Sequence, residues 1–290
     1  MLSTGIYYGS WASKWWGDTI DLENMPPGTG IVYLSFCKPF PKDMFGGLEF
    51  TQSLPIIQQS IKTVQAKGIL VMLSVGGGAY KFENQAPYAD YAAVVKLAKL
   101  LGCNGIDIDW EPNVDELGYL PDGAFGPIIH GFRSNGWGGM KLSCAAAPAG
   151  AYPVEPGQLW KGLNIKGLIS NGHELDWVNI MAYDSGMEYE PTRAFDSFRQ
   201  LYKGPLYLGI EIGPQGWGNE ITTTDDVIKY RAHVSKDSNA GFFVWAFHKD
   251  NTGSPTIKEI IEIVLATEQI VATGLVCPNC KKSLKLALTE

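Results

Sequence analysis

Short apolar segments, rich in β-branched and aromatic residues, recur along the chain at fairly even intervals. Such segments are typical of buried strands. They predict eight strands, at residues 5–9, 31–36, 69–75, 105–109, 140–145, 177–182, 206–210 and 242–247. Apolar residues at helical spacing lie between most of these strands. One example is the set Ile56, Ile57, Ile61 and Val64.

The alternation of strands and helices favours parallel strand pairing, because each parallel return needs a connection about as long as a helix. Gly68, Gly102 and Gly204 stand where helices are expected to end, as C-terminal caps do. A last helix is expected at residues 256–267.

Eight strand–helix units in 290 residues most economically close into a single (β/α)₈ barrel. An open doubly wound sheet is the alternative, but no phosphate-binding GxGxxG motif follows the first strand. We expect residues 1–273 to form the barrel and residues 274–290 to form a mobile tail. That tail contains Cys277-Pro278-Asn279-Cys280, half of a zinc-ribbon knuckle, without the two further ligands that a complete site needs.

Composition narrows the function classes. The chain is 45% hydrophobic and 18% charged, which is typical of a globular domain. Its net charge of −7 argues against nucleic acid and anionic lipid as partners. No apolar run reaches the roughly 20 residues of a membrane span, and the start MLSTGIYYGSW lacks the regions of an export signal. The five cysteines are too few and too widely spread to suggest the disulfide framework of a small secreted fold. We expect the protein to be a monomer.

Three acidic residues alternate along the fourth strand and just beyond it. Because strand side chains alternate, Asp107, Asp109 and Glu111 share one face, which we expect to point into the barrel. Catalytic residues of such barrels lie at the carboxyl ends of the strands, where Glu111 stands. Three carboxylates stacked in a dehydrated interior must retain and share at least one proton. Glu111 is therefore the expected proton donor, as protonation of a glycosidic oxygen requires.

These acids allow two other interpretations. The first is a buried cluster that serves packing or an ion pair, which is costly without a function. The second is a divalent-metal site. Metal sites usually recruit histidine, and the four histidines here form no HxH or HExxH pattern. We therefore expect neither a metal nor another cofactor.

Residues 105–111, GIDIDWE, resemble the DGxDxDxE signature of the family-18 glycoside hydrolases, the chitinases and their relatives. Three further segments are similar to motifs of that family: LSVGGG at residues 73–78, MAYD at residues 181–184, and Trp245 on the last strand. Residues 7–9 and 145–148 resemble its compact branch, which lacks an α+β insertion. The resemblance extends from Gly5 to about Thr267.

This resemblance implies hydrolysis of β-1,4-linked N-acetylglucosamine in chitin or chito-oligosaccharides, with the substrate's own N-acetyl group as nucleophile. Glu111 is then the acid and base. Asp109 orients the N-acetyl group, Asp107 shares a proton with Asp109, and Tyr183 hydrogen-bonds the acetamido oxygen. The residues expected to bind substrate are Asp184, Met181, Trp245, Tyr7, Phe36, Gly76, Gly77 and Trp217.

Several alternatives stay open at this point. An endo-β-N-acetylglucosaminidase acting on glycans or peptidoglycan has the same acids, and a chitin-binding lectin can use the same fold without cleavage. The first Asp of the family's signature is replaced by Asn104 here. Asn104 lies on the opposite face from the three acids, so we expect the replacement to affect only the structural support of the site. Members of the family are usually exported, which leaves the compartment undecided.

Overall fold

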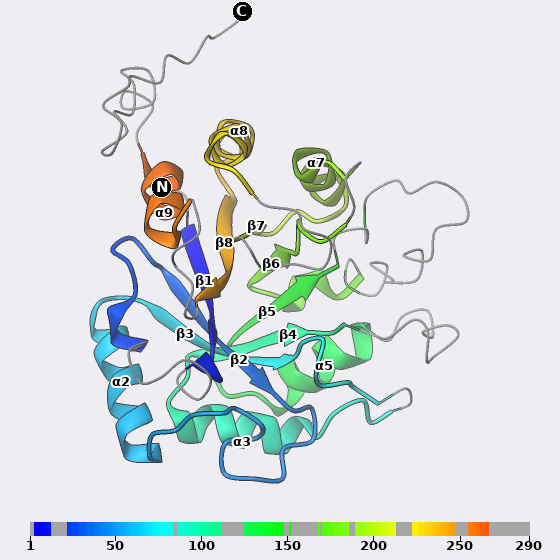
Figure 1. The fold of residues 1–290 in the computed structure, drawn as a ribbon. Coiled ribbons are helices and arrows are strands. Elements are labelled where there is room, and N and C mark those ends of the chain that lie inside the picture. The colour runs from blue at the N-terminus through cyan, green and yellow to red at the C-terminus, as the bar shows by residue number, and fades with distance from the viewer. Residues whose placement is uncertain are drawn as a thin grey trace, which may run out of the picture.

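The structure, a computed structural model, forms a closed barrel of eight parallel strands that pair in chain order (Figure 1). It describes residues 3–12, 22–83, 86–111, 125–147, 151, 168, 170–185, 189–212, 222–247 and 255–266. The strands are β1 (Ser3–Gly9), β2 (Ile31–Cys37), β3 (Leu70–Gly76), β4 (Gly105–Asp109), β5 (Lys141–Ala146), β6 (Trp177–Ile180), β7 (Leu206–Glu211) and β8 (Ala240–Phe247). The predicted fold class is confirmed, and no predicted strand end is more than two residues away from the observed one.

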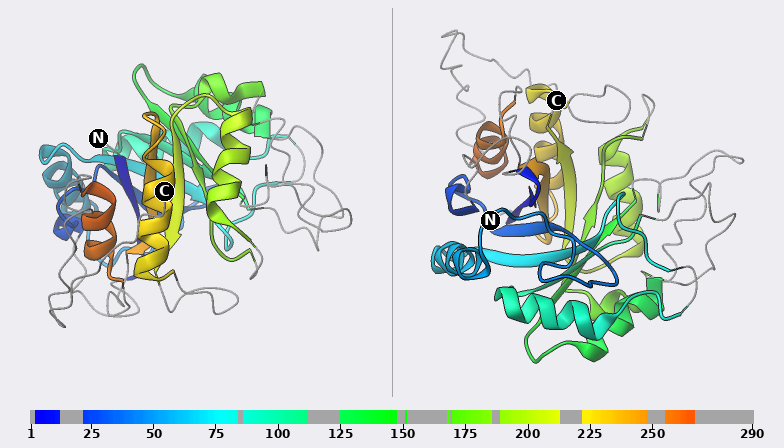
Figure 2. Two further views of the ribbon diagram at one scale, coloured as in Figure 1. Left: turned by 90° about the horizontal axis from the view of Figure 1, so that it is seen from above. Right: turned by 60° about the horizontal axis from the view of Figure 1, so that its bottom comes forward.

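Helices cover the outside of the barrel (Figure 2). They are α2 (Leu54–Ala66), α3 (Tyr91–Leu101), α5 (Phe125–Asn135), α7 (Pro191–Leu201), α8 (Thr224–Val234) and α9 (Ile257–Leu265), with 3₁₀ turns η1 (Leu22–Asn24) and η4 (Gly172–Glu174). In α2, Ile57 and Ile61 are buried against the strands, as their spacing predicts. Ile56 is 54% exposed, so its expected place in the apolar stripe is wrong. None of the helices in these ranges is both long and apolar enough to cross a membrane.

Two of the three glycines predicted to end helices have the backbone conformation that this role requires. Gly102 caps α3 with φ of 86°, and Gly68 follows α2 with φ of 82°. The prediction for Gly204 is wrong, because α7 ends at an extended cap, Tyr202. Gly204 instead makes room for that ring: a Cβ atom there would lie 2.2 Å from the Tyr202 hydroxyl oxygen.

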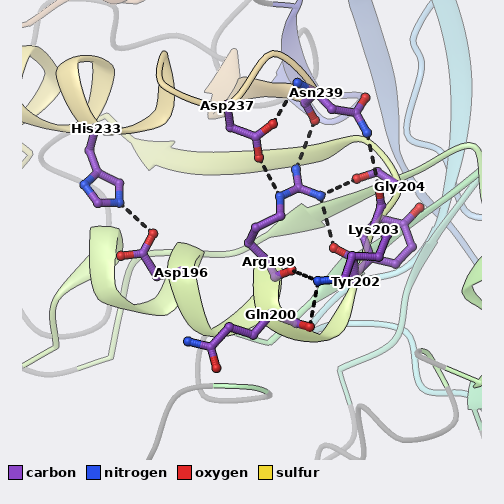
Figure 3. Close-up of polar contacts among 9 residues, drawn as sticks. All are labelled: Asp196, Arg199, Gln200, Tyr202, Lys203, Gly204, His233, Asp237 and Asn239. Carbon is purple, nitrogen blue, oxygen red and sulfur yellow. Dashed lines mark hydrogen bonds and ion pairs between the residues drawn. The ribbon is translucent and has the colours of Figure 1, made fainter.

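An arginine in the last turn of α7 ties together the segments that lead into β7 and β8 (Figure 3). Arg199 donates hydrogen bonds to the main-chain oxygens of Tyr202, Gly204 and Asn239, and it pairs with Asp237 at 2.5 Å. The clamp lies at the amino ends of the strands, opposite the face where catalysis is expected. It fixes the two strands that carry Glu211 and Trp245, which face each other in register.

The apolar core consists of two clusters. The larger one lies between the strands and the helices and includes Ile106, Ile108 and Trp110 of the fourth strand region. The smaller one lies inside the barrel and includes Tyr7, Tyr33, Phe36, Met72, Trp177, Tyr207 and Phe243. The alternation predicted for residues 105–111 is confirmed. The apolar residues of this segment face the helices, and its acids face the barrel interior.

Candidate active site

The deepest acid of the series, Asp107, lies between two serines of the neighbouring strands. It pairs in register with Ser74 of β3 and Ser143 of β5, and it is 0% exposed. Oδ2 of Asp107 accepts hydrogen bonds from Tyr7 and Ser74, each at 2.8 Å, and Oδ1 accepts one from Ser143 at 2.6 Å. Burial raises the pKa of Asp107, and these three hydrogen bonds offset part of the rise.

The hydroxyl group of Tyr7 belongs to a chain of hydrogen bonds across the barrel interior. Trp177 Nε1 donates to the Tyr33 hydroxyl at 2.8 Å, and that hydroxyl donates to Asn179 Oδ1 at 3.3 Å. Asn179 Nδ2 donates to the Tyr7 hydroxyl at 3.2 Å, which donates to Asp107. An indole N–H can only donate, so the Tyr33 hydroxyl is the acceptor in its bond with Trp177. Asp107 at its end is an acceptor, which favours its ionised form.

The two upper acids form a hydrogen-bonded pair. The carboxyl group of Asp109, which is 3% exposed, shares a hydrogen bond with the carboxyl group of Glu111. Burial raises the pKa of Asp109 well above its ordinary value, and the charges of Glu111 and Asp107 and the bond to Glu111 raise it further. Burial and the neighbouring charges thus favour the protonated form of Asp109 in its pair with Glu111. Asp107 accepts three hydroxyl hydrogen bonds, and the expectation that it shares a proton with Asp109 stays a prediction.

Burial also raises the pKa of Glu111. The ammonium group of Lys81, the hydrogen bond with Asp109 and the main-chain N–H of Gly78 offset part of this rise, while Asp184 adds to it. A carboxyl group with a raised pKa, half-buried just beyond the carboxyl end of β4, can deliver a proton near neutral pH.

A turn of three glycines after β3 holds both upper acids through its main chain. The N–H of Gly77 donates to the main-chain oxygen of Asp109 at 2.8 Å, and the N–H of Gly78 bonds to the Glu111 carboxyl group. Gly76 has φ of 109°, and a Cβ atom there would lie 2.0 Å from the Asp109 oxygen. A Cβ atom on Gly77 would lie 2.6 Å from the Phe36 ring. The sequence can therefore place only glycine at these positions.

Tyr183 and Asp184 follow β6 and face the acids from the other side. Burial raises the pKa of the Tyr183 phenol well above its ordinary value, with further contributions from Asp109, Glu111, Glu211 and Asp184, so the phenol stays protonated. Asp184 has φ of 53°, the one positive value at a non-glycine residue in the described part of the chain.

Aromatic rings line the mouth of the barrel between β1, β2 and β8. Trp245 stacks on Phe36 with ring centroids 5.6 Å apart and lies edge-on to Tyr7 at 5.8 Å. Trp11 stacks on Phe36 at 6.1 Å and extends this surface. Met181 packs against the same interior cluster. The half-buried face of Trp245 can lie under a sugar ring, because flat apolar rings stack on sugar faces.

Most of the predicted site residues come together at this mouth. Trp217 lies outside the described residues, as does the Cys277–Cys280 motif. Asn104 lies at the opposite end of β4, where its side chain accepts hydrogen bonds from the Val71 N–H and from Gln65. It supports the strand ends and does not touch the acids.

Sequence analysis missed Ser143 and Asn179, which complete the hydrogen bonding of Asp107. Their signal was present: Ser143 is a polar residue between Leu142 and Cys144 in a buried strand, and Asn179 shares the parity of Trp177 and Met181. A further acid, Glu211, is 3% exposed at the carboxyl end of β7.

No cluster of three or more metal-ligating side chains occurs within the ranges that the structure describes. The carboxyl groups of the site are instead paired with hydroxyl groups, main-chain N–H groups and one another. Such an arrangement can donate a proton from Glu111 and stabilise positive charge beside Asp109.

Comparison with known proteins places this geometry in context. The model of the glycosyl hydrolases family 18 matches residues 3–251. A chitinase from Pseudoalteromonas aurantia superposes with a TM-score of 0.68 at 20% identity, covering 90% of this chain and 98% of that chain. A chitinase from Bacteroides thetaiotaomicron superposes with a TM-score of 0.61 at 13% identity, and the match covers 91% of this chain and 97% of that chain. A xylanase and α-amylase inhibitor protein from Scadoxus multiflorus superposes with a TM-score of 0.64 at 16% identity, and the match covers 91% of this chain and 98% of that chain.

Proposed function

Because the chain belongs to family 18 of the glycosyl hydrolases, we propose that it hydrolyses β-1,4 linkages between N-acetylglucosamine units, as in chitin and chito-oligosaccharides. The reaction retains the anomeric configuration and uses the substrate's acetamido group as nucleophile, an exception to the usual scheme of two carboxylates. One observation carries the proposal. Beside the proton-sharing pair, the buried Oδ1 of Asp109 has no hydrogen-bond partner among the described residues.

In the first step, Glu111 donates its proton to the glycosidic oxygen. The bond between that oxygen and the anomeric carbon breaks, and the leaving sugar departs as an alcohol. The carbonyl oxygen of the acetamido group forms a bond to the anomeric carbon from the other side. The product is an oxazolinium ion, which carries one positive charge, and Glu111 is left as a carboxylate.

Asp109 and Tyr183 stabilise this intermediate. Oδ1 of Asp109 accepts a hydrogen bond from the acetamido N–H, which satisfies the buried oxygen, and the Asp109 carboxylate neutralises the positive charge. Tyr183 donates its hydroxyl proton in a hydrogen bond to the acetamido oxygen, and the raised pKa of its phenol keeps that proton available. The three hydroxyl donors to Asp107 favour its carboxylate form, which leaves the shared proton to the upper pair.

In the second step, water attacks the anomeric carbon and Glu111 accepts its proton. The acetamido group is restored and the configuration is retained. Trp245 forms the floor under the sugar ring, and Asp184 holds the sugar beside the cleaved bond. Tyr7, Phe36, Met181 and the glycine turn complete the walls of this subsite, and Trp217 is expected to stack on a further sugar.

Glu111→Gln tests the assignment of the proton donor. Chito-hexaose turnover is expected to fall by several orders of magnitude while binding of the oligosaccharide remains, because the amide keeps the shape and loses the acid. Glu262→Gln is the matched control, since Glu262 is an exposed carboxylate on the outer helix α9. Unchanged hydrolysis by the Glu111→Gln protein would refute the assignment.

Product analysis by mass and anomeric form distinguishes the related activities. Retained β-anomers from chito-hexaose support the proposal. Cleavage restricted to a glycoprotein or to peptidoglycan would identify an endo-β-N-acetylglucosaminidase instead, and binding without cleavage would identify a lectin. Loss of activity in a chelator would point to a metal-dependent hydrolase.

A further inference from the structure

A lysine at the rim of the site contacts the main chain of the expected proton donor. Lys81 lies between the glycine turn and α3, and its ammonium group donates a hydrogen bond to the main-chain oxygen of Glu111 at 3.2 Å. Its side chain is exposed, and the mechanism above does not use it. A positive charge is thereby held next to the residue whose ionisation state controls catalysis.

Four structural elements present charged, titratable or hydrogen-bonding groups to Glu111. They are Asp109 of β4, Tyr183 and Asp184 after β6, Gly78 of the turn after β3, and Lys81 beyond that turn. The negative charge of Asp184 makes ionisation of Glu111 harder, whereas the hydrogen bond with Asp109 favours it. Among the groups that favour ionisation, Lys81 has the largest influence.

We propose that Lys81 is a positioning residue that fixes the main chain of Glu111 and sets the upper pH limit at which the acid pair can donate a proton. The inference rests on the proposed function and adds to it the group that adjusts its pH range. Opposite charges favour each other's ionised forms, so the ammonium group promotes early loss of the shared proton. Without that charge, the Asp109–Glu111 pair keeps its proton to higher pH.

The sign of this effect makes the test sharp. Removing Lys81 is expected to increase kcat/KM on the alkaline side of the pH profile. On that side kcat/KM falls because the free enzyme loses the proton that it must donate. A folding defect or a misplaced main chain can only lower activity. A gain at high pH therefore distinguishes a charge effect from a structural one.

The experiment compares the pH dependence of kcat/KM on chito-hexaose for the unmodified protein, Lys81→Met and Lys81→Arg. The alkaline limb of Lys81→Met is expected at higher pH, with activity there about twofold to fivefold greater, the range typical of one exposed charge pair. The difference should shrink in 1 M salt, where the Debye length is about 3 Å. Lys81→Arg keeps the charge and should keep the original profile.

Lys96→Met is the matched control, because Lys96 is an exposed lysine on the outer face of α3. It is expected to leave the profile unchanged. An alkaline limb that stays in place in Lys81→Met, or moves to lower pH, would overturn the inference while leaving the hydrolase assignment intact.

A second measurement does not depend on turnover. The carboxyl carbon of Glu111 can be followed by NMR in protein labelled with ¹³C-glutamate and assigned with Glu111→Gln. Its titration midpoint is expected to rise in Lys81→Met and not in Lys96→Met. If the midpoint rises but chito-hexaose is not cleaved, the proposed substrate fails and the role of Lys81 stands. An unmoved midpoint overturns that role.

Discussion

Replacing Tyr7 with phenylalanine removes one hydroxyl group from the barrel interior and leaves the ring in place. That hydroxyl donates to Asp107 at 2.8 Å and accepts from Asn179 at 3.2 Å. The ring packs on Tyr33 with centroids 4.4 Å apart, so its packing should survive the change. The variant therefore tests whether hydrogen bonding to the deepest acid controls the proton of the upper pair.

The magnitude follows from the lost bond. A hydrogen bond to a charged group contributes about 1.5–3 kcal/mol. With one donor missing, Asp107 becomes more basic and competes for the proton that Glu111 must donate. If the whole contribution is expressed in the transition state, kcat falls by about tenfold to a hundredfold. KM should change little, because the hydroxyl lies beneath the sugar subsite.

The assay measures kcat and KM on chito-hexaose across pH, together with urea unfolding. Tyr33→Phe is the control, since Tyr33 is equally buried and loses hydrogen bonds to Asn179 and Trp177 but touches no acid. The two variants should lose similar stability, whereas only Tyr7→Phe should lose kcat. Equal kcat values for the two variants would refute the reasoning that links Tyr7 to catalysis.

Four further predictions concern stability and substrate choice. Arg199→Met should lower the free energy of unfolding by about 2–4 kcal/mol in urea titrations, because three carbonyls lose their donor, without changing the kcat of the folded fraction. Gly76→Ala should cost about 3 kcal/mol or more, seen as loss of the cooperative transition, since its Cβ meets the Asp109 oxygen. Burial alone would raise the pKa of Asp176, but hydrogen bonds from Lys141, the Leu142 N–H and Arg133 lower this pKa overall. The stabilisation is thus present above the unfolded pKa near 4 and lost as pH falls through the lower pKa of the folded state. Asp176→Asn should therefore be less stable than the parent protein at pH 7, and the difference should shrink as the pH falls below about 4. Asp109→Asn should abolish cleavage of acetylated substrates; equal cleavage of fully deacetylated ones by the parent protein would argue against assistance by the acetamido group.

Much of the fold is predictable from the sequence because its signals are local. The spacing of the strands, the glycine that ends α3 and the alternation of residues 105–111 each depend on a few neighbouring residues. Gly204 shows where this fails. A glycine after a helix suggests a cap, but here its small size serves a ring two residues earlier, a contact that only the three-dimensional arrangement reveals.

The site was predictable to the level of its acids and no further. The parity of β4 places Asp107 and Asp109 inside, whereas their partners come from strands far apart in the chain. Closure of the barrel brings Asn179 within reach of Tyr7, which is 172 residues away in sequence. The hydrogen bond between Asp109 and Glu111 depends on the conformations of their side chains, which the spacing of residues in the sequence does not determine. Lys81 could be found only because its loop folds back over the end of β4.

The turn formed by Gly76, Gly77 and Gly78 has a consequence for mutagenesis surveys of this protein. Its contribution to both acids comes from amide hydrogens and from empty space, neither of which a side-chain deletion can remove. An alanine scan would add a methyl group here, and it would record Gly76 and Gly77 as intolerant and ascribe the effect to folding. Replacing single amide linkages by esters would silence one donor at a time, and would show how strongly the backbone itself governs acidity at this centre.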